Sequence, residues 1–359
     1  MYVPTAASGA RCIRTGQGGQ PAPRIIGRVP HTFPEKTLST GRKILDDLRL
    51  PVVGPPMFLV SGPKLVIAQC KAGVLGAFPA LNARPQELLD AWLTQIGDAL
   101  DAHRREHPDA IVAPYAVNLI VNPANKRLDA DLETCVKHKV PVVITSLGAP
   151  TALAKRVHEY GGVVFHDVIR VRYAEKALEA GVDGLILVCA GAGGHAGRIN
   201  PFALTREVRR FYDGPLVLAG AITDGGGVLA AQAMGCDAAY LGTRFIATHE
   251  SMAAEHYKRM IVDCTAEDIV YTPYFSGVHG SYLKPSIRNA GLDPDNLPAE
   301  APEGVKYRSR DERPKTWKEI FGAGQGVGNV DAVLPAAEVI DRMVREYEAA
   351  RAAVCARSA

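Results

Sequence analysis

The sequence predicts an α/β protein, a (β/α)₈ or TIM barrel with an inserted segment after the eighth strand and a C-terminal helix. Short apolar runs alternate with amphipathic segments eight times between Pro51 and Gly242. Glycine-containing turns, such as Tyr160-Gly161-Gly162, mark the boundaries of these runs. The chain has 359 residues, which is enough for a complete barrel. Eight β/α repeats without a long break match a closed parallel barrel.

The eight apolar runs are the expected strands, and the amphipathic segments between them are the expected helices. The runs are short and bounded by turn residues, as buried parallel strands are. The expected strands are Pro55–Val60, Gly73–Phe78, Ala113–Val121, Val140–Ser146, Gly162–Asp167, Gly184–Cys189, Pro215–Gly220 and Ala238–Gly242. The expected helices between them are Pro63–Lys71, Arg84–His107, Ala130–Lys137, Pro150–Tyr160, Arg172–Ala180, Ala203–Phe211 and Gly227–Met234.

The competing architecture is a doubly wound open sheet that binds a dinucleotide. Gly191, Gly193 and Ala196 satisfy a loose G-x-G-x-x-A pattern. The fingerprint of that fold normally follows the first strand and opens a helix directly. Here the pattern follows the sixth strand, and Asn200-Pro201 is expected to separate it from the next helix. The position of the pattern therefore argues against the open sheet.

The remaining segments divide the chain around a barrel at residues 42–247. Residues 1–41 are rich in Gly, Pro, Arg and Thr and predict an extended or partly disordered arm, which suggests a homodimer. Residues 248–325 form a proline-containing insertion that is expected to cover the mouth of the barrel. Residues 326–359 form a closing segment, in which Pro335–Ala353 has the spacing of a helix.

Composition excludes several classes of protein. The net charge of +3 and the absence of a basic block give no support to a nucleic-acid partner. No apolar stretch approaches the ~18 residues that a membrane span needs. The seven scattered cysteines have no C-x-x-C spacing and predict buried thiols in a reducing, cytoplasmic compartment. No His/Cys/Asp cluster with metal-ligand spacing was identified, and no metal is predicted.

The loop after the sixth strand carries one chemically active side chain. Residues 191–197 read Gly-Ala-Gly-Gly-His-Ala-Gly and follow the buried run Gly184–Cys189. A loop with so few side chains lets the backbone approach a flat or anionic ligand. His195 is the imidazole in this loop, and its reference pKa near ~6.5 suits acid or base work near neutral pH. We predict His195 as the catalytic residue, whereas His166 is interpreted as structural.

The loops after strands seven and eight predict a phosphate site. Gly220-Ala221 precedes Thr223-Asp224-Gly225-Gly226-Gly227, and Gly242-Thr243 ends the eighth strand. These two loops form the usual phosphate site of this barrel, and a following helix N-terminus favours an anion. Other strand ends, at Met57-Phe58, Asn118, Ser146 and His166-Asp167, offer contacts to a planar ring. A single phosphate cradle predicts FMN rather than a dinucleotide.

Four motifs in order resemble the nitronate monooxygenase family, formerly called 2-nitropropane dioxygenases. They are Gly193-Gly194-His195, Ala219-Gly220-Ala221, Leu241-Gly242-Thr243 and Ala323-Gly324-Gln325-Gly326-Val327-Gly328, and the similarity runs from about Leu48 to Met343. The resemblance implies a TIM barrel with non-covalently bound FMN and His195 as the base. With the strand ends above, the predicted cofactor-binding residues are Pro56, Met57, Phe58, Asn118, Ser146, Gly193, Gly194, Gly220, Ala221, Gly242, Thr243 and Gln325. The chain departs from the family at Asp167, where some relatives carry lysine, and at Ala221, where many carry glycine.

The resemblance implies a flavin-dependent oxidoreductase, with a small molecule and dioxygen as its partners. The leading hypothesis is FMN-dependent oxidation of alkyl nitronates, and of nitroalkanes, by dioxygen to a carbonyl compound and nitrite. The alternative is an NAD(P)H-dependent FMN reductase that acts on quinones or enoyl thioesters. A flavin-binding scaffold without turnover is a third hypothesis. His279 and Lys284 of the insertion are interpreted as solvated loop groups, with contact to substrate or to a nucleotide phosphate as the alternative.

Overall fold

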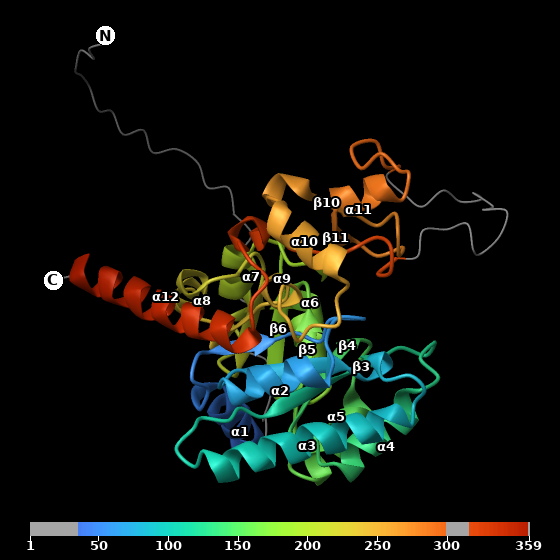
Figure 1. The fold of residues 1–359 in the computed structure, drawn as a ribbon. Helices are drawn as coiled ribbons and strands as arrows, with labels where there is room; N and C mark the ends of the chain where they lie inside the picture. Colours follow the sequence, from blue (N-terminus) through green and yellow to red (C-terminus); the bar gives the residue numbers. More distant parts are fainter. Residues whose placement is uncertain (1–34, 299–315, 358–359) are drawn as a thin grey trace, which may run out of the picture. The chain divides into compact units, whose positions relative to one another are not determined.

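Eight parallel strands close into a barrel in the computed structural model, which describes residues 35–298 and 316–357 (Figure 1). The strands follow one another in chain order, and β1 pairs with β9 to complete the ring. A short strand, β7, lies outside the barrel between β6 and β8. The barrel strands are β1 (Val52–Gly54), β2 (Leu75–Pro79), β3 (Tyr115–Val121), β4 (Val142–Leu147), β5 (Val163–Val168), β6 (Gly184–Val188), β8 (Leu216–Ala219) and β9 (Ala238–Tyr240).

Helices cover the outside of the barrel and bury apolar stripes against it, as the predicted alternation requires. They are α2 (Pro63–Lys71), α3 (Leu88–Glu106), α4 (Leu128–Lys137), α5 (Thr151–Glu159), α6 (Val171–Glu179), α7 (Pro201–Val208) and α8 (Gly225–Ala233). A short 3₁₀ turn, η1 (Ala80–Asn82), follows β2, and α9 (Thr243–Ile246) follows β9. The eight-stranded barrel is confirmed, and the predicted helices overlap the observed ones.

Strand residues alternate between two cores. One set packs under the helices, and the other fills the barrel interior. This alternation follows from the two-residue period of a strand. The interior set includes Val53, Leu75, Ala77, Ala116, Val142, Ile144, Phe165, Ile186, Val217 and Ala238.

The first predicted strand, Pro55–Val60, is wrong, because the first strand is β1 at Val52–Gly54. Two consecutive prolines at positions 55 and 56 have no N–H to donate to a strand ladder. The chain instead turns: the N–H groups of Val60 and Ser61 both donate to the carbonyl of Met57, at 3.2 and 2.9 Å. The other predicted strands overlap the observed ones.

Two further boundaries differ from the sequence prediction. Residues 1–34 of the expected arm lie outside the described residues, and helix α1 (Glu35–Asp46) occupies the rest of that arm. Asn200 and Pro201 do not separate the glycine loop from the next helix. Asn200 caps α7 by accepting the N–H of Phe202 at 2.9 Å, and Pro201 is its first residue, where a missing N–H costs little.

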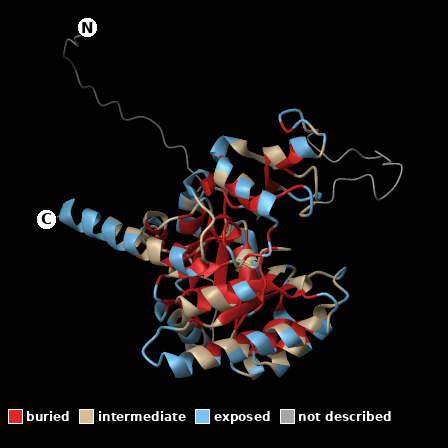
Figure 2. Ribbon diagram, viewed as in Figure 1, coloured by how far each residue is buried: buried red, intermediate tan, exposed pale blue. Residues whose placement is uncertain are grey.

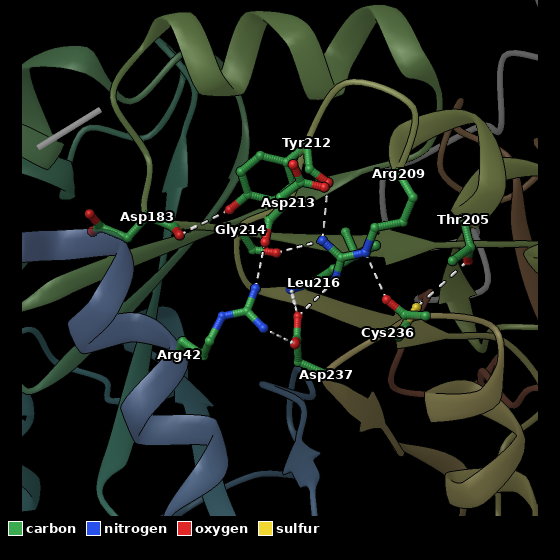
Figure 3. Close-up of polar contacts among 11 residues, drawn as sticks. Arg42, Asp183, Thr205, Arg209, Tyr212, Asp213, Gly214, Leu216, Cys236 and Asp237 are labelled. Carbon is green, nitrogen blue, oxygen red and sulfur yellow. Dashed lines mark hydrogen bonds and ion pairs between the residues drawn. The ribbon is translucent and has the colours of Figure 1, made fainter. Parts of the chain in front are cut away.

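A cluster of ion pairs ties α1 to the barrel (Figure 3). Asp237 accepts from Arg42 of α1 at 2.9 Å, from Arg209 at 2.8 Å and from the backbone N–H of Leu216 at 2.7 Å. Nearby, Tyr212 donates its hydroxyl to the carbonyl of Asp183 at 3.0 Å. These bonds join α1, the end of α7 and the starts of β8 and β9. Asp237 therefore holds together elements that are distant in the sequence.

We expect Asp237→Asn to lower the free energy of unfolding by about 3 kcal/mol, because it leaves two guanidinium groups without their shared carboxylate. The side chain of Asp237 is 13% exposed, so solvent compensates little of this loss. Urea unfolding followed by circular dichroism measures the effect. The control is Asp47→Asn, which removes an exposed pair with Lys43 and should change stability by at most about 0.5 kcal/mol. Equal effects of the two substitutions would contradict the structural role of Asp237.

The insertion builds a small antiparallel sheet on the loop after β6. Its elements are α10 (Glu255–Asp263), η2 (Ala266–Asp268), β10 (Ile269–Thr272), β11 (Gly280–Leu283) and α11 (Lys284–Asn289). Strand β11 pairs with β10 on one side and with β7 (Gly194–His195) on the other. The described part of the insertion therefore lies at the carboxyl end of the barrel strands.

The chain returns to the barrel through η3 (Gln325–Asn329) and ends in α12 (Ala336–Arg357). Helix α12 buries Ala336, Val339, Ile340 and Met343 against the barrel, and its C-terminal half is exposed (Figure 2). None of the helices that the structure describes has the length and hydropathy of a membrane span.

Candidate active site

Polar side chains form the upper layer of the barrel interior. Asn118, Ser146, Asp167 and Tyr240 each lie two positions after an interior residue of their strand, so they point into the barrel near its carboxyl end. The amide of Asn118 donates to Ser146 Oγ at 2.9 Å, and Ser146 Oγ donates to Asp167 Oδ2 at 2.6 Å. This chain of bonds crosses β3, β4 and β5. It forms a polar floor under the mouth of the barrel.

Burial of this floor changes the ionisation of its acidic groups. Burial raises the pKa of Asp167 to about 6, although the hydrogen bond from Ser146 opposes the shift. Burial, with a smaller contribution from the charge of Asp167, raises the pKa of Tyr240 well above its ordinary value. Among the described residues, neither Asp167 Oδ1 nor the Tyr240 hydroxyl has a hydrogen-bond partner. Unpartnered buried oxygens are costly and often mark a functional site.

We expect Asp167→Asn to remove the decrease in unfolding free energy that ionisation of this carboxyl causes as the pH rises. The folded pKa of about 6 lies above the ordinary value of 3.8, so the carboxyl favours folding at low pH. That contribution is complete below about pH 4 and is lost as the pH rises through 6, by up to about 3 kcal/mol. Urea unfolding of both proteins at pH 4, 6 and 8 should show the variant gaining relative stability as the pH rises. A difference that does not change with pH would contradict the raised pKa.

Four chain segments meet above the floor with glycine at their contacts. The carbonyl of Gly191 accepts the N–H groups of Ala221 at 3.2 Å and of Gln325 at 2.9 Å. Gly324 donates its N–H to Thr243 Oγ1 at 2.9 Å. A Cβ on Gly193 would lie 2.8 Å from the nitrogen of Gly324. The loops after β6, β8 and β9 and the segment before η3 therefore pack too closely for side chains at these points.

The predicted phosphate cradle has fewer donors than the sequence indicates. The N-terminus of α8 is already occupied by carboxylates, because Asp224 accepts from Gly227 at 2.7 Å and Glu346 accepts from Gly225 at 3.0 Å. Two of the three glycine N–H groups in that turn therefore already have carboxylate acceptors. Within the described residues, the N–H groups of Gly220 and Gly242 donate to no other group. These two N–H groups and the hydroxyl of Thr243 remain to hold a phosphate, and they fit FMN.

The other predicted cofactor residues lie around the same mouth. Met57 uses its N–H and carbonyl inside the turn after β1, and its sulfur lies 3.5 Å from the position of a Cβ on Gly242. Pro56 and Phe58 flank Met57 in this turn, and the guanidinium of Arg84 lies 5.2 Å from the centre of the Phe58 ring. Gln325 Oε1 lies 3.2 Å from the position of a Cβ on Gly191.

His195 reaches the site from β7 and contacts the insertion. Its Nε2 lies 2.8 Å from Ser276 Oγ, and Trp317 packs its edge against the imidazole at 83° and 5.4 Å between ring centres. Partial desolvation by these neighbours lowers the pKa of His195, although the residue keeps an exposed surface. The imidazole is therefore neutral at pH 7 and able to accept a proton. Ser276, Tyr282 and Trp317 are functional candidates that sequence reasoning missed, because no local pattern joins them to residue 195.

Other histidines and Lys284 have structural contacts. His166 points out of the barrel interior, lies 2.7 Å from the hydroxyl of Thr145, and has its pKa lowered to about 4 by burial. His279 stacks on Tyr271 at 5.2 Å between ring centres. Lys284 forms an ion pair with Asp295 at 2.7 Å, so its side chain has a partner within the insertion.

Among the described residues, a group with metal-ligand geometry that was not predicted lies elsewhere. His103, Glu106 and His107, at the C-terminal end of α3, bring their ligand atoms within 4.8 Å of one another. The statement that no cluster has ligand spacing is therefore wrong for this helix. The group belongs to the outer surface of the barrel and not to the mouth.

Glycine-lined loops, a polar floor and the imidazole of His195 lie at the carboxyl rim of this (β/α)₈ barrel, and comparison with known proteins shows the chain to be a flavin-dependent oxidoreductase. The family model described as nitronate monooxygenase matches residues 42–346. The chain belongs to this family.

Relatives of the chain carry more than one activity in their names. A nitronate monooxygenase of Paraburkholderia phytofirmans is 28% identical over 338 residues, which cover 83% of this chain and 92% of the relative. A protein of Rhodococcus jostii is 27% identical over 254 residues, covering 71% of this chain and 68% of the relative. It is named (3aS,4S,5R,7aS)-5-hydroxy-7a-methyl-1-oxo-octahydro-1H-indene-4-carboxyl-CoA dehydrogenase. The structure of a nitroalkane oxidase from Streptomyces ansochromogenes superposes with a TM-score of 0.72 at 26% identity, covering 87% of this chain and 99% of that one.

Proposed function

We propose that this protein binds FMN and oxidises alkyl nitronates with dioxygen to a carbonyl compound and nitrite, with nitroalkanes as further substrates. The observation that carries the proposal is the position of a neutral imidazole, His195, on a strand at the barrel rim beside the glycine-lined loops. The Paraburkholderia and Streptomyces proteins named above support a nitro compound as the substrate.

In this proposal, residues of the barrel rim and the polar floor hold the cofactor, and His195 transfers the proton. Gly220, Gly242 and Thr243 would hold the phosphate through two N–H groups and a hydroxyl, the last two residues lying at the start of the short helix α9. Asn118 and Asp167 of the polar floor would offer polar groups to the cofactor. FMN, when bound, supplies the oxidation of the nitronate and the transfer of electrons to dioxygen. His195 takes the α-proton of a nitroalkane. Alternatively, the protonated imidazole of His195 donates a hydrogen bond to an incoming nitronate.

The alternative function is an NAD(P)H-dependent flavin reductase acting on quinones or enoyl thioesters. The Rhodococcus relative favours it, since its name specifies a carboxyl-CoA substrate. Its identity to this chain, 27%, is close to the 28% of the Paraburkholderia protein. The two functions differ in the molecule that reduces the flavin.

Anaerobic mixing experiments separate these functions. Purified yellow protein is mixed without oxygen with propyl nitronate, with NADH or with NADPH, and the flavin absorbance is followed. Bleaching by propyl nitronate alone supports the proposed function, whereas rapid bleaching by NADH or NADPH supports the reductase. Protein that none of the three reduces would support a flavin-binding scaffold and contradict both enzymes.

A further inference from the structure

We propose that Ser276 is a positioning residue that holds the imidazole of His195 as the Nε2–H tautomer, so that Nδ1 carries the lone pair. Only the use of that lone pair as a base rests on the proposed function. The assignment of the tautomer follows from hydrogen-bond contacts between β7 and the loop before β11.

The direction of the bonds around Ser276 is set by the chemistry of its partners. Ser276 Oγ donates to the carbonyl of Val278 at 3.0 Å and lies 2.8 Å from His195 Nε2. A carbonyl oxygen can only accept, and a serine hydroxyl has one proton. When that proton is donated to Val278, as the 3.0 Å contact indicates, Oγ accepts at its contact with His195. The imidazole accordingly carries its hydrogen on Nε2.

Tyr282 completes the arrangement around the same oxygen. Its hydroxyl lies 3.2 Å from Ser276 Oγ. Burial raises the pKa of Tyr282, so its hydroxyl stays protonated and is available as a donor. Ser276 Oγ then accepts from His195 and from Tyr282 and donates to the carbonyl of Val278. These three bonds use both lone pairs and the proton of the serine hydroxyl. In the opposite tautomer, Ser276 would donate to His195, and the carbonyl of Val278 would lose its donor.

The ring is also held in place by backbone pairing and by an aromatic contact. His195 pairs with Gly280 of β11, and the N–H of the next residue, Ala196, donates to the carbonyl of His279 at 3.3 Å. The edge-on contact with Trp317 limits rotation of the imidazole. Within residues 35–298 and 316–357, Nδ1 has no hydrogen-bond partner. Nδ1 is therefore the nitrogen left to meet a substrate proton.

Protonation of Nδ1 would not require the network to reorganise. The imidazolium that forms donates from Nε2 to Ser276 as the neutral ring already does. A second group that fixes the tautomer of a catalytic histidine is a recurring arrangement in enzymes. Ser276 acts through His195 and does not itself touch the reacting atoms.

Nitrogen NMR of the holoprotein tests the assignment directly. The protein is labelled with ¹⁵N-histidine, and long-range ¹H–¹⁵N spectra are recorded at pH 8, where His195 is neutral. The chain has ten histidines, so the spectrum of His195→Gln identifies the resonances of this ring. We expect Nε2 to show the shift of a protonated ring nitrogen and Nδ1 that of an unprotonated one.

Three variants give the expected contrasts. Ser276→Ala should move both nitrogen shifts toward the average of the two tautomers, and Ser276→Thr, which keeps the hydroxyl, should restore the wild-type shifts. Thr316→Val is the matched control: it removes a hydroxyl that donates to the carbonyl of Phe275 in the same loop, at 3.0 Å, but leaves Ser276 intact. Its His195 shifts should not change.

Two results would overturn the proposal: an unprotonated Nε2 in the wild-type spectrum, or unchanged His195 shifts in Ser276→Ala. Neither depends on turnover. A protein with the expected spectrum that fails to oxidise nitronates would contradict the proposed function and support the tautomer assignment.

Discussion

His195→Gln should lower kcat/KM for nitroalkanes by about 10²–10⁴-fold, the usual contribution of a general base. Glutamine keeps the length and polarity of the side chain but cannot accept a proton near neutral pH. In the wild-type protein the same rate should rise with pH, with an inflection below 6.5, because desolvation lowers the pKa of His195 from that value. Steady-state rates between pH 5 and 9, together with the flavin content of each protein, measure both effects.

The control for this substitution is His279→Gln. His279 lies in the same loop as Ser276, and its ring stacks on Tyr271 at 5.2 Å between ring centres. Its replacement should change kcat/KM by less than about threefold, since a surface stacking contact is worth ~0.5 kcal/mol or little more. Equal losses in both variants would show that the loop, and not the base, limits the reaction.

Gly220→Ala should weaken FMN binding by about 10- to 100-fold. A Cβ at this position would lie 2.9 Å from the carbonyl oxygen of Ala190 and 3.3 Å from Pro201 Cγ, and the backbone φ of +151° is strained for a side chain. The loop must move, and its free N–H moves with it. A displaced phosphate donor costs about 1–3 kcal/mol, which corresponds to that change in affinity. Titration of the apoprotein with FMN, followed by flavin fluorescence, measures the dissociation constant.

Gly161→Ala separates backbone strain from the loss of the cradle. Gly161 has a φ of +88°, and a Cβ there would meet no atom within 4 Å. This variant should lose about 1–2 kcal/mol of stability through its backbone conformation but bind FMN as the wild type does. Comparable losses of FMN affinity in both variants would mean that Gly220 acts only through the stability of the fold.

The barrel could be predicted from the sequence because its signal is local. Each strand is an apolar run of a few residues, and each helix shows its own period. Pro55–Val60 was misassigned because it is apolar, and apolar character alone does not distinguish a strand from a buried turn. The two prolines in that run cannot donate to a strand ladder and are the local signal against a strand. The correct strand, Val52–Gly54, is only three residues long.

The candidate site could be predicted only in part. The glycine loops and His195 lie next to strand ends, where a parallel barrel brings residues together. The contact of His195 with Ser276 joins residues 81 apart, and Glu346 reaches the N-terminus of α8 from 121 residues away. Such pairings depend on how the insertion and α12 pack. No periodicity of the chain specifies them.

The pairing of β7 with β11 joins the strand that carries His195 to the sheet of the insertion. The proposed FMN contacts lie on the barrel rim, whereas the position of the imidazole depends on pairing with a strand of the insertion. A change of length or sequence near Ser276 can therefore move the imidazole of His195 without moving the loops that carry Gly220 and Gly242. Members that share this layout can diverge in substrate preference while they keep the same prosthetic group.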